Sequence, residues 1–307
     1  MNWIKKGRVF NVDKNFDWMY SHASMPFAEH MKDDVFKIYF STRNSDNESS
    51  VAYIEVDIKR PNQILRISDR PLLSKGKLGT FDDSGTMGSC IVNIENKKYM
   101  YYIGWSLGVS VPFRNAIGLA VSENDGESFQ RVFEGPIIDR TQYEPYFTAS
   151  NCVLQDNGVF KTWYLSCTGW TKINGKSVHH YHIKYAESSN GIDWIREGVV
   201  AIDYKDKYEY AISAPRVIKE HGVYKMWFSS RGAKETGTYR IRYAESEDGI
   251  KWIRKDDSVG IDVGIQGWDS EMICYPFVFD HKGERYMLYN GNDYGKTGFG
   301  LAILETL

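Results

Sequence analysis

One pattern occurs three times in the chain: LAVSENDGESFQR at 119–131, YAESSNGIDWIRE at 185–197 and YAESEDGIKWIRK at 243–255. Each copy is a strand-like run followed by Asn-Gly or Asp-Gly, with an aromatic residue three positions after the glycine. These dipeptides predict two-residue β-hairpins, because a type I′ turn needs positive φ at both central residues. Gly126, Gly191 and Gly249 lie 65 and 58 residues apart. That spacing indicates one propeller blade per repeat.

A second element precedes these hairpins and occurs five times. Each copy is a short apolar strand, a polar turn and a longer strand with aromatic residues at alternate positions. Its near-continuous apolar runs are typical of strands that are covered on both faces. The copies are SMPFAEHMKDDVFKIYFSTR (24–43), GSCIVNIENKKYMYYIGW (88–105), SNCVLQDNGVFKTWYLSCTGW (150–170), APRVIKEHGVYKMWFSSR (214–231) and YPFVFDHKGERYMLYNGND (275–293).

The fifth unit ends the chain without an outer strand, and the N-terminus offers one. The segment WIKKG at 3–7 matches WIREG at 194–198. We therefore predict an all-β, five-bladed β-propeller of four-stranded antiparallel blades, in which the N-terminal strand joins the last blade and closes the ring. A seven-bladed ring or a β-sandwich would not predict five units plus this remainder. The predicted single domain, 1–307, has its blades at about 17–70, 80–135, 143–200, 208–257 and 268–307, with 1–10 completing the last.

The composition is that of a globular protein, with 42% hydrophobic and 25% charged residues. The net charge is −2 and the basic residues are scattered, so we expect no nucleic-acid partner. No apolar run reaches the length of a membrane span or of a signal peptide, which predicts a cytoplasmic protein without a membrane partner. The sequence indicates no oligomeric state. Aromatic residues are abundant at 15%, which suits both β-strands and the stacking of sugar rings.

Acidic residues recur just upstream of the predicted inner strands, whose starts converge at one end of a propeller channel. Asp83, Glu144 and Asp269 each lie seven positions before the inner-strand proline or its equivalent, and Glu209 lies six before Pro215. Such acids either cap turns or bind sugar hydroxyls and supply an acid–base pair. The predicted catalytic set is Glu144 as general acid, Asp83 as base or pKa modulator, and Asp269 or Glu271 as the remaining carboxylate.

The ends of the second strands point to the same region. Arginine suits bidentate binding of a carboxylate or phosphate, and tryptophan can stack on a sugar. The alternatives are surface salt bridges for the arginines and packing between blades for the tryptophans. The predicted substrate-binding residues are His22, Arg43, Trp105, Trp170, Glu209, Arg216, Arg231 and Asp293.

No motif indicates a metal or a cofactor. The four cysteines (Cys90, Cys152, Cys167 and Cys274) lack CxxC spacing and lie in apolar runs, which predicts buried free thiols. The cluster HHYH at 179–182 lies on an alternating strand without further ligands, so we expect a solvated strand face. Walker, GxGxxG and GxSxG motifs are absent from the sequence.

Over its whole length, the repeated blade pattern resembles the five-bladed propellers of glycoside hydrolase families 43, 32, 68 and 130. The resemblance implies a glycoside substrate, water or phosphate as the acceptor, and carboxylates as acid and base. Those families usually place a catalytic Asp or Glu one or two residues before the inner-strand proline. None of the corresponding residues here is acidic: Ser24-Met25, Gly88-Ser89, Ala149-Ser150, Ser213-Ala214 and Cys274-Tyr275.

We therefore expect a glycosidase-like enzyme that cleaves a small or intracellular glycoside with displaced carboxylates. Two alternatives stay open at this point. One is a glycan-binding propeller without catalysis. The other is a glycoside phosphorylase, for which Arg43, Arg216, Arg231 and His22 could supply the cationic cluster.

Overall fold

The computed structural model describes residues 1–232 and 237–305, and its regular structure is almost all strand. The all-β prediction is confirmed. The strands are β1 (Trp3–Phe10), β2 (Ser21–Lys32), β3 (Val35–Arg43), β4 (Ser49–Asp57), β5 (Ile64–Ile67), β6 (Gly85–Ile94), β7 (Lys97–Leu107), β8 (Phe113–Ser122), β9 (Gln130–Arg131), β10 (Thr148–Asp156), β11 (Val159–Ile173), β12 (Lys176–Ser188), β13 (Val200–Ile202), β14 (Ala211–Glu220), β15 (Val223–Arg231), β16 (Arg240–Ser246), β17 (Ile253–Arg254), β18 (Cys274–His281), β19 (Glu284–Asn290) and β20 (Phe299–Leu304). Two short helical turns, η1 (Asp256–Ser258) and α1 (Asn292–Gly295), complete the described structure.

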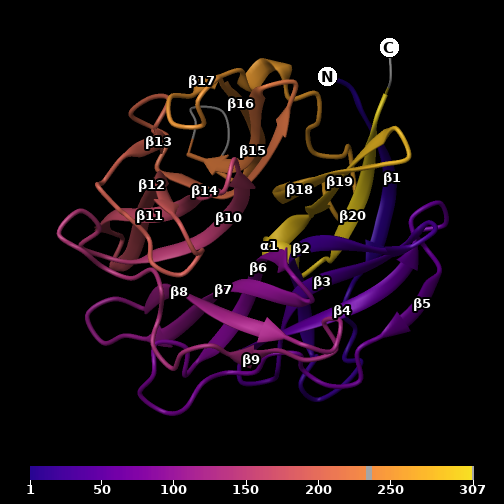
Figure 1. The fold of residues 1–307 in the computed structure, drawn as a ribbon, viewed down its shortest axis with the longest axis horizontal. Coiled ribbons are helices and arrows are strands. Elements are labelled where there is room, and N and C mark those ends of the chain that lie inside the picture. The colour runs from indigo at the N-terminus through magenta and orange to yellow at the C-terminus, as the bar shows by residue number, and fades with distance from the viewer. Residues whose placement is uncertain (233–236, 306–307) are drawn as a thin grey trace.

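The strands pair into one four-stranded and two eight-stranded sheets. Each eight-stranded sheet is two antiparallel sets joined by a single parallel pair, Ser49↔Gly85 in one sheet and Tyr181↔Ala211 in the other. The described strands thus form antiparallel sets that we call units 1 to 5, and the first strand of each unit lies nearest the centre (Figure 1). The units are β2–β5, β6–β9, β10–β13, β14–β17, and β18–β20 with β1.

Unit 5 is built from both ends of the chain. Strand β1 pairs antiparallel with β20, with Trp3 opposite Leu304, so the two ends lie together (Figure 1). The main-chain N–H of Trp3 also donates to the carbonyl of Gly260, after η1. The N-terminal segment therefore supplies the outer strand that the last unit lacks.

The glycines of the repeat fit against an aromatic side chain of the preceding unit. Gly191 has φ +74°, and a Cβ there would lie 2.7 Å from the hydroxyl of Tyr101 on β7. The Tyr101 hydroxyl donates to the Gly191 carbonyl at 2.8 Å, and the Trp163 indole donates to the Gly249 carbonyl at 2.7 Å. The repeat is thus explained by close packing between units as well as by the turn.

The turns themselves are longer than the predicted two-residue hairpins. Strand β8 ends at Ser122 and β9 begins only at Gln130. Positive φ at two successive residues occurs only in the first repeat, at Asp125 and Gly126, among the three predicted turns. In all three turns a serine hydroxyl accepts the glycine N–H, as Ser188 does from Gly191 at 2.9 Å. This serine bond fixes a wider loop than a type I′ turn would give.

The aromatic residue of each repeat packs against an aromatic residue at the equivalent position of the preceding unit. Its ring centroid lies about 6 Å from the centroid of that residue, which belongs to the second strand of the preceding unit. The pairs are Tyr39–Phe129 at 6.2 Å, Tyr101–Trp194 at 6.2 Å, Trp163–Trp252 at 5.9 Å and Trp227–Trp3 at 6.3 Å. Trp3 therefore occupies in unit 5 the place that Trp194 and Trp252 occupy in units 3 and 4.

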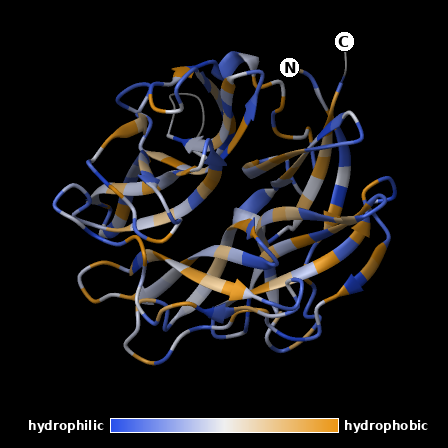
Figure 2. Ribbon diagram, viewed as in Figure 1, coloured by the Kyte–Doolittle hydropathy of each residue, from blue (hydrophilic) through white to orange (hydrophobic). Residues whose placement is uncertain are grey.

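Clusters of buried hydrophobic residues lie between successive units. Hydrophobic residues recur along the strands of every unit (Figure 2). One cluster joins units 1 and 2 through residues such as Tyr39 and Tyr102, and others join units 2 and 3, 3 and 4, and 4 and 5. A further cluster joins unit 5 to unit 1, with Phe299 and Phe40 among its members. In the described part of the chain, neither helical turn is long and apolar enough to cross a membrane.

Candidate functional site

A cavity of about 550 Å³ opens where the units meet. It is formed by the beginnings of first strands, the ends of second strands and the beginnings of β8 and β12. A cavity of this size can hold a small ligand such as a mono- or disaccharide. It is lined by His22, Ser24, Met25, Arg43, Met87, Ile103, Trp105, Phe113, Asn115, Phe147, Ala149, Ser150, Leu165, His179, Tyr181, Ser213, Arg231, Tyr275 and Tyr294.

Every first strand has a register shift beside this cavity. The shifts fall between Ser24 and Phe27, Gly88 and Cys90, Ala149 and Asn151, Ser213 and Arg216, and Cys274 and Phe277. A β-bulge changes the direction of the side chains that follow it. The same irregularity in five strands therefore aims a ring of side chains into one space.

Backbone strain also occurs beside this cavity. Met25, Ala214 and Tyr275 have φ of 54°, 48° and 55°, a region that costs a side-chain-bearing residue about 1–2 kcal/mol. Side chains of neighbouring strands hold these residues: Asn290 accepts the Met25 N–H at 2.7 Å, and Ser229 accepts the Tyr275 N–H at 2.8 Å. Strain supported in this way is typical of functional sites.

Arg231, at the end of β15, is fixed in a cage of aromatic rings. Its guanidinium lies 5.3 Å from the ring centre of Tyr210 and 4.9 Å from that of Tyr239. It donates to the Tyr294 hydroxyl at 2.6 Å and to Nε2 of His179 at 3.0 Å. Because arginine only donates, His179 accepts through Nε2 and is neutral. Burial, followed by the charge of Arg231, lowers the pKa of His179 to about 4.

Arg43 and His22 lie together on the unit 1 side. Burial lowers the pKa of His22 to about 4, and the charges of Arg43 and Lys296 act in the same direction. Asp293 opposes that shift, so a carboxylate stands within electrostatic range of the imidazole. Burial likewise lowers the pKa of Arg43. This side of the cavity is therefore cationic at neutral pH through arginine rather than histidine.

Aromatic side chains line the cavity beside these polar groups. Phe113 packs edge-on against Phe147 and Trp170, with ring centroids 5.8 and 5.4 Å away. Trp105 is fixed by a 2.7 Å hydrogen bond from its indole to Ser49. Trp170 itself packs behind the lining residues instead of facing the cavity. Flat apolar walls beside polar groups suit the two faces of a sugar ring.

The cavity lining, as far as the chain is described, contains no Asp or Glu. The positions where the resembled families carry catalytic acids do face the cavity, as Ser24, Met25 and Ala149 show. None of the four predicted catalytic residues lines it. Their proposed roles stay predictions, and the contacts of these acids explain their recurrence in another way.

Glu144 is fully buried and bound on all sides. Tyr164 donates to it at 3.0 Å, and Lys184 and Arg196 each approach to 3.4 Å. Thr141 donates a further hydrogen bond. The carboxylate therefore neutralises two cations and ties the loop before β10 to β11 and β12.

The same arrangement recurs in units 2, 4 and 5. Asp269 accepts from Tyr289 at 3.1 Å and pairs with Lys5 of β1 at 2.7 Å. Burial opposes the ionisation of Glu209, but hydrogen bonds and charge from Arg254 outweigh it and hold its pKa below the ordinary value. In unit 2 the equivalent residue is Asp82, which accepts from Tyr102 and pairs with Arg131 at 2.7 Å. These four acids fasten the loops that precede the first strands.

The remaining predicted acids lie at the surface or in turns. Asp83 accepts the Gly79 N–H at 3.0 Å and the Ser84 hydroxyl at 3.1 Å, as a turn-capping residue does. Glu271 and Asp293 are exposed. Asp293 lies outside the lining, in α1, where it and Tyr294 both have positive φ.

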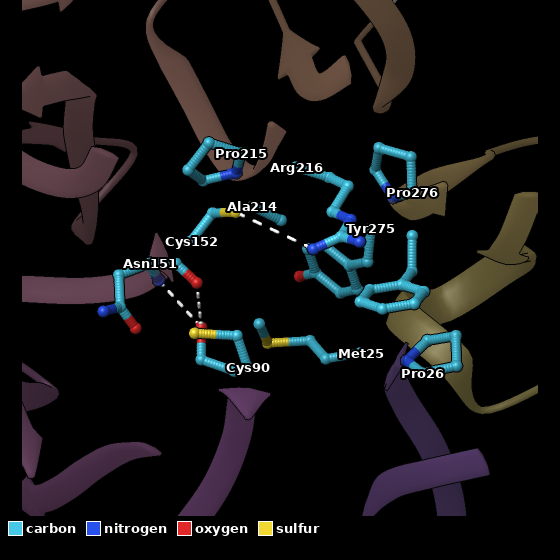
Figure 3. A pocket seen from close by; sticks show the side chains of 12 residues that line it. Met25, Pro26, Cys90, Asn151, Cys152, Ala214, Pro215, Arg216, Tyr275 and Pro276 are labelled. Carbon is cyan, nitrogen blue, oxygen red and sulfur yellow. Dashed lines mark hydrogen bonds between the residues drawn. The ribbon is translucent and has the colours of Figure 1, made fainter. Parts of the chain in front are cut away.

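Arg216 points into a second, smaller pocket of about 30 Å³ on the same axis (Figure 3). Its guanidinium donates to the Val278 carbonyl at 2.8 Å and lies 4.1 Å from the ring centre of Phe277. Met25 and Tyr275 line both pockets. Arg216 is thus separated from Arg43 and Arg231, with which the sequence grouped it.

All four cysteines are buried free thiols, as predicted. Cys90 and Cys152 line the smaller pocket (Figure 3). The Cys152 sulfur accepts the Val217 N–H at 3.3 Å. No three His, Cys, Asp or Glu side chains are grouped to hold a metal ion within residues 1–232 and 237–305.

The structure brings four predicted substrate-binding residues into one cavity: His22, Arg43, Trp105 and Arg231. It adds others that the sequence did not single out, above all His179, Tyr181, Tyr275 and Tyr294. The expected solvated face of HHYH is wrong for His179, which faces the cavity. Strand alternation offered a signal here, because positions 179 and 181 share a face.

Solved structures with the same fold include glycoside hydrolases. A structure described as a complex of BT0996 and RGII matches with a TM-score of 0.77 and 16% identity, over 99% of the present sequence and 93% of its own. A thermostable family-43 glycoside hydrolase matches with a TM-score of 0.67 and 18% identity, over 94% and 91%. A Bacteroides ovatus glycosyl hydrolase matches with a TM-score of 0.74 and 12% identity, over 99% and 94%.

No protein-family model matches the sequence. The uncharacterized Mycobacterium tuberculosis protein Rv1502 is 42% identical over 305 residues, which cover 99% of the present sequence and all of Rv1502. The protein belongs to the Rv1502 family. The uncharacterized protein MT1551 of a second strain of that species matches equally, at 42% identity. The family thus shares its fold with glycoside hydrolases, whereas Rv1502 and MT1551 are described only as uncharacterized proteins.

Proposed function

We propose that the protein is a single-domain, five-bladed β-propeller that binds a glycoside in the cavity lined by Arg43, Trp105 and Arg231. The five antiparallel units support the blade count, and the pairing of β1 with β20 supports closure of the ring. The packing of Trp3 on Trp227 repeats the contact between the other units, which also favours closure.

The observation that carries the proposal is the make-up of this cavity. Its lining combines aromatic rings such as Trp105 and Phe113, two arginines, two histidines, and residues with hydroxyl groups such as Ser24 and Tyr275. Apolar ring faces and hydrogen-bond donors are what the two kinds of surface on a sugar require. Strained residues surround the cavity, which supports a binding role for this region over a purely structural one.

Two-carboxylate hydrolysis has little support from the same geometry. Glycosidases of the common type place two carboxyl groups about 5–9.5 Å apart on either side of the scissile bond. The described lining offers no carboxylate, and Glu144 and Asp269 are engaged with cations. We therefore favour binding without hydrolysis over the displaced-carboxylate glycosidase.

One observation favours a second candidate, a glycoside phosphorylase. Asp293 stands within electrostatic range of His22, next to the cationic side of the cavity. In phosphorolysis a phosphate oxygen attacks the anomeric carbon and the glycosidic bond breaks. The leaving oxygen must take up a proton from an acid, for which Asp293 is the candidate, and the arginines would hold the phosphate. This reaction needs one carboxyl group where hydrolysis needs two.

A screen of aryl-glycosides and sugar phosphates, with and without inorganic phosphate, tests the proposal. We expect at least one sugar to raise the melting temperature of the purified protein without turnover. Phosphate-dependent turnover that Asp293→Asn abolishes would select the phosphorylase. Phosphate-independent hydrolysis that Glu144→Gln abolishes, in a variant that stays folded, would contradict the proposal and restore the two-carboxylate enzyme.

A further inference from the structure

The two arginines of the cavity have no carboxylate partner among the described residues. Several other inward-facing cations of this protein pair with acids, whereas Arg216 bonds a main-chain carbonyl. Lys37 binds Glu127 at 2.7 Å, and Arg254 binds Glu209 at 2.6 Å. Arg43 and Arg231 have no such acid partner, although burial disfavours an unpaired charge.

Arg231 is held rigidly in spite of this cost. Its Nε is buried without a hydrogen-bond partner, and its two terminal nitrogens each make a single hydrogen bond, to Tyr294 and His179. A guanidinium has five N–H donors, so one hydrogen on each terminal nitrogen stays free for a ligand. The rings of Tyr210 and Tyr239 pack near the group. An arginine held in this way is pre-organised to receive an oxyanion.

Arg43 adds a second positive charge to the same space. Its side chain makes no hydrogen bond or ion pair with the residues that the structure describes, although burial lowers its pKa. Tyr275 lines the cavity together with both arginines. Lys296 adds positive charge near His22, and exposed Asp293 is the opposing acid.

We infer that the cavity is an oxyanion receptor, and that Arg231 and Arg43 bind a carboxylate or phosphate group carried by the glycoside. This inference rests on the proposed function and names its substrate class. The charge of the ligand replaces the carboxylate that these arginines lack in the protein. Trp105 and Phe113, which line the same cavity, then contact the sugar ring.

Calorimetric titration with four probes tests the inference: methyl glucoside, methyl glucuronide, glucose 1-phosphate and inorganic phosphate. Hydrogen bonds to charged groups predict that an anionic sugar binds about 10- to 100-fold more tightly than the neutral one. Arg43→Gln should remove this preference, and Arg231→Lys should weaken it because lysine lacks the planar fork. Arg70→Gln, an exposed arginine outside the cavity, is the matched control and should change nothing.

The outcomes separate the inference from the proposed function. Equal affinity for methyl glucoside and the charged sugars overturns the inference and leaves glycoside binding standing. Binding of inorganic phosphate that Arg43→Gln removes, without any sugar binding, supports the receptor, assigns free phosphate as the anion and contradicts the proposed function. Failure of every anion to bind at millimolar concentration overturns the inference. Circular dichroism of each variant confirms that the arginine change leaves the fold intact.

Discussion

Replacing Glu144 with glutamine removes a negative charge that two buried cations share. The carboxylate is fully buried, and the side chains of Lys184 and Arg196 are only 8% and 13% exposed. Water therefore has little access to the two cations and cannot solvate them in place of the carboxylate. Removing one partner of a buried ion pair costs about 3–5 kcal/mol. The hydrogen bond from Tyr164 can survive at the amide oxygen, so this range describes the charge alone.

The loss can be expressed as a melting temperature. Unfolding entropy near 2.1 cal/mol/K per residue gives roughly 0.6 kcal/mol/K for a protein of this length. A loss of 3–5 kcal/mol then lowers the melting temperature by about 5–8 °C. Differential scanning calorimetry measures this shift, and denaturation by urea gives the free energy independently.

Glu271→Gln is the matched control, because Glu271 is exposed and was predicted from the same upstream pattern. Surface changes of this kind cost less than about 0.5 kcal/mol. Sugar binding per folded molecule should be the same in both variants as in the native protein. The reasoning fails if Glu144→Gln keeps the native melting temperature but loses sugar binding or turnover, because Glu144 would then act on the ligand.

Three further perturbations test other parts of the structure. Asp82→Asn should lower the melting temperature by several degrees and Asp83→Asn by much less, because Asp82 pairs with Arg131 at 2.7 Å whereas Asp83 caps a turn; equal shifts in calorimetry would contradict this. The contribution of His22 and His179 to the free energy of unfolding should be full above about pH 6.5 and fall as the pH drops towards 4. These histidines have a pKa of about 4 in the folded state, so between these pH values they bind protons only in the unfolded chain. For His179 the loss is at most about 3 kcal/mol, and urea titrations at pH 7 and 4.5 should show a smaller fall in His179→Gln; an unchanged fall would refute the assignment. Gly126→Ala should destabilise more than Gly158→Ala, since both have φ near +80° but only at Gly126 would a Cβ meet a neighbour, 2.2 Å from the Tyr39 hydroxyl; similar free energies of unfolding would show that unit packing is not the reason for the repeat.

The all-β class could be predicted from the sequence because its signals are local. The spacing between Gly191 and Trp194 recurs in the other repeats. Trp3 could be assigned to the last unit because WIKKG at 3–7 matches WIREG at 194–198. The structure adds the reason, which is packing on Tyr101 and Trp227 of the preceding units.

The site was harder to predict because its residues depend on backbone irregularities. The conformation of the loop before β6 decides whether Asp82 or Asp83 points inwards, and the amino-acid sequence does not reveal that conformation. Tyr275 reaches the cavity through a positive φ and a register shift that a tyrosine does not signal. Arg43 and Arg231 could be predicted as site residues because each is the last residue of a regular strand.

A crystal structure of the protein soaked with a glycoside that stabilises it tests the central claim most directly. The account predicts a sugar in the cavity of about 550 Å³, with one ring face against Trp105 or Phe113 and a polar group within hydrogen-bond distance of Arg43 or Arg231. A sugar bound outside this cavity, or a sugar held there between Glu144 and a second carboxylate, would contradict it.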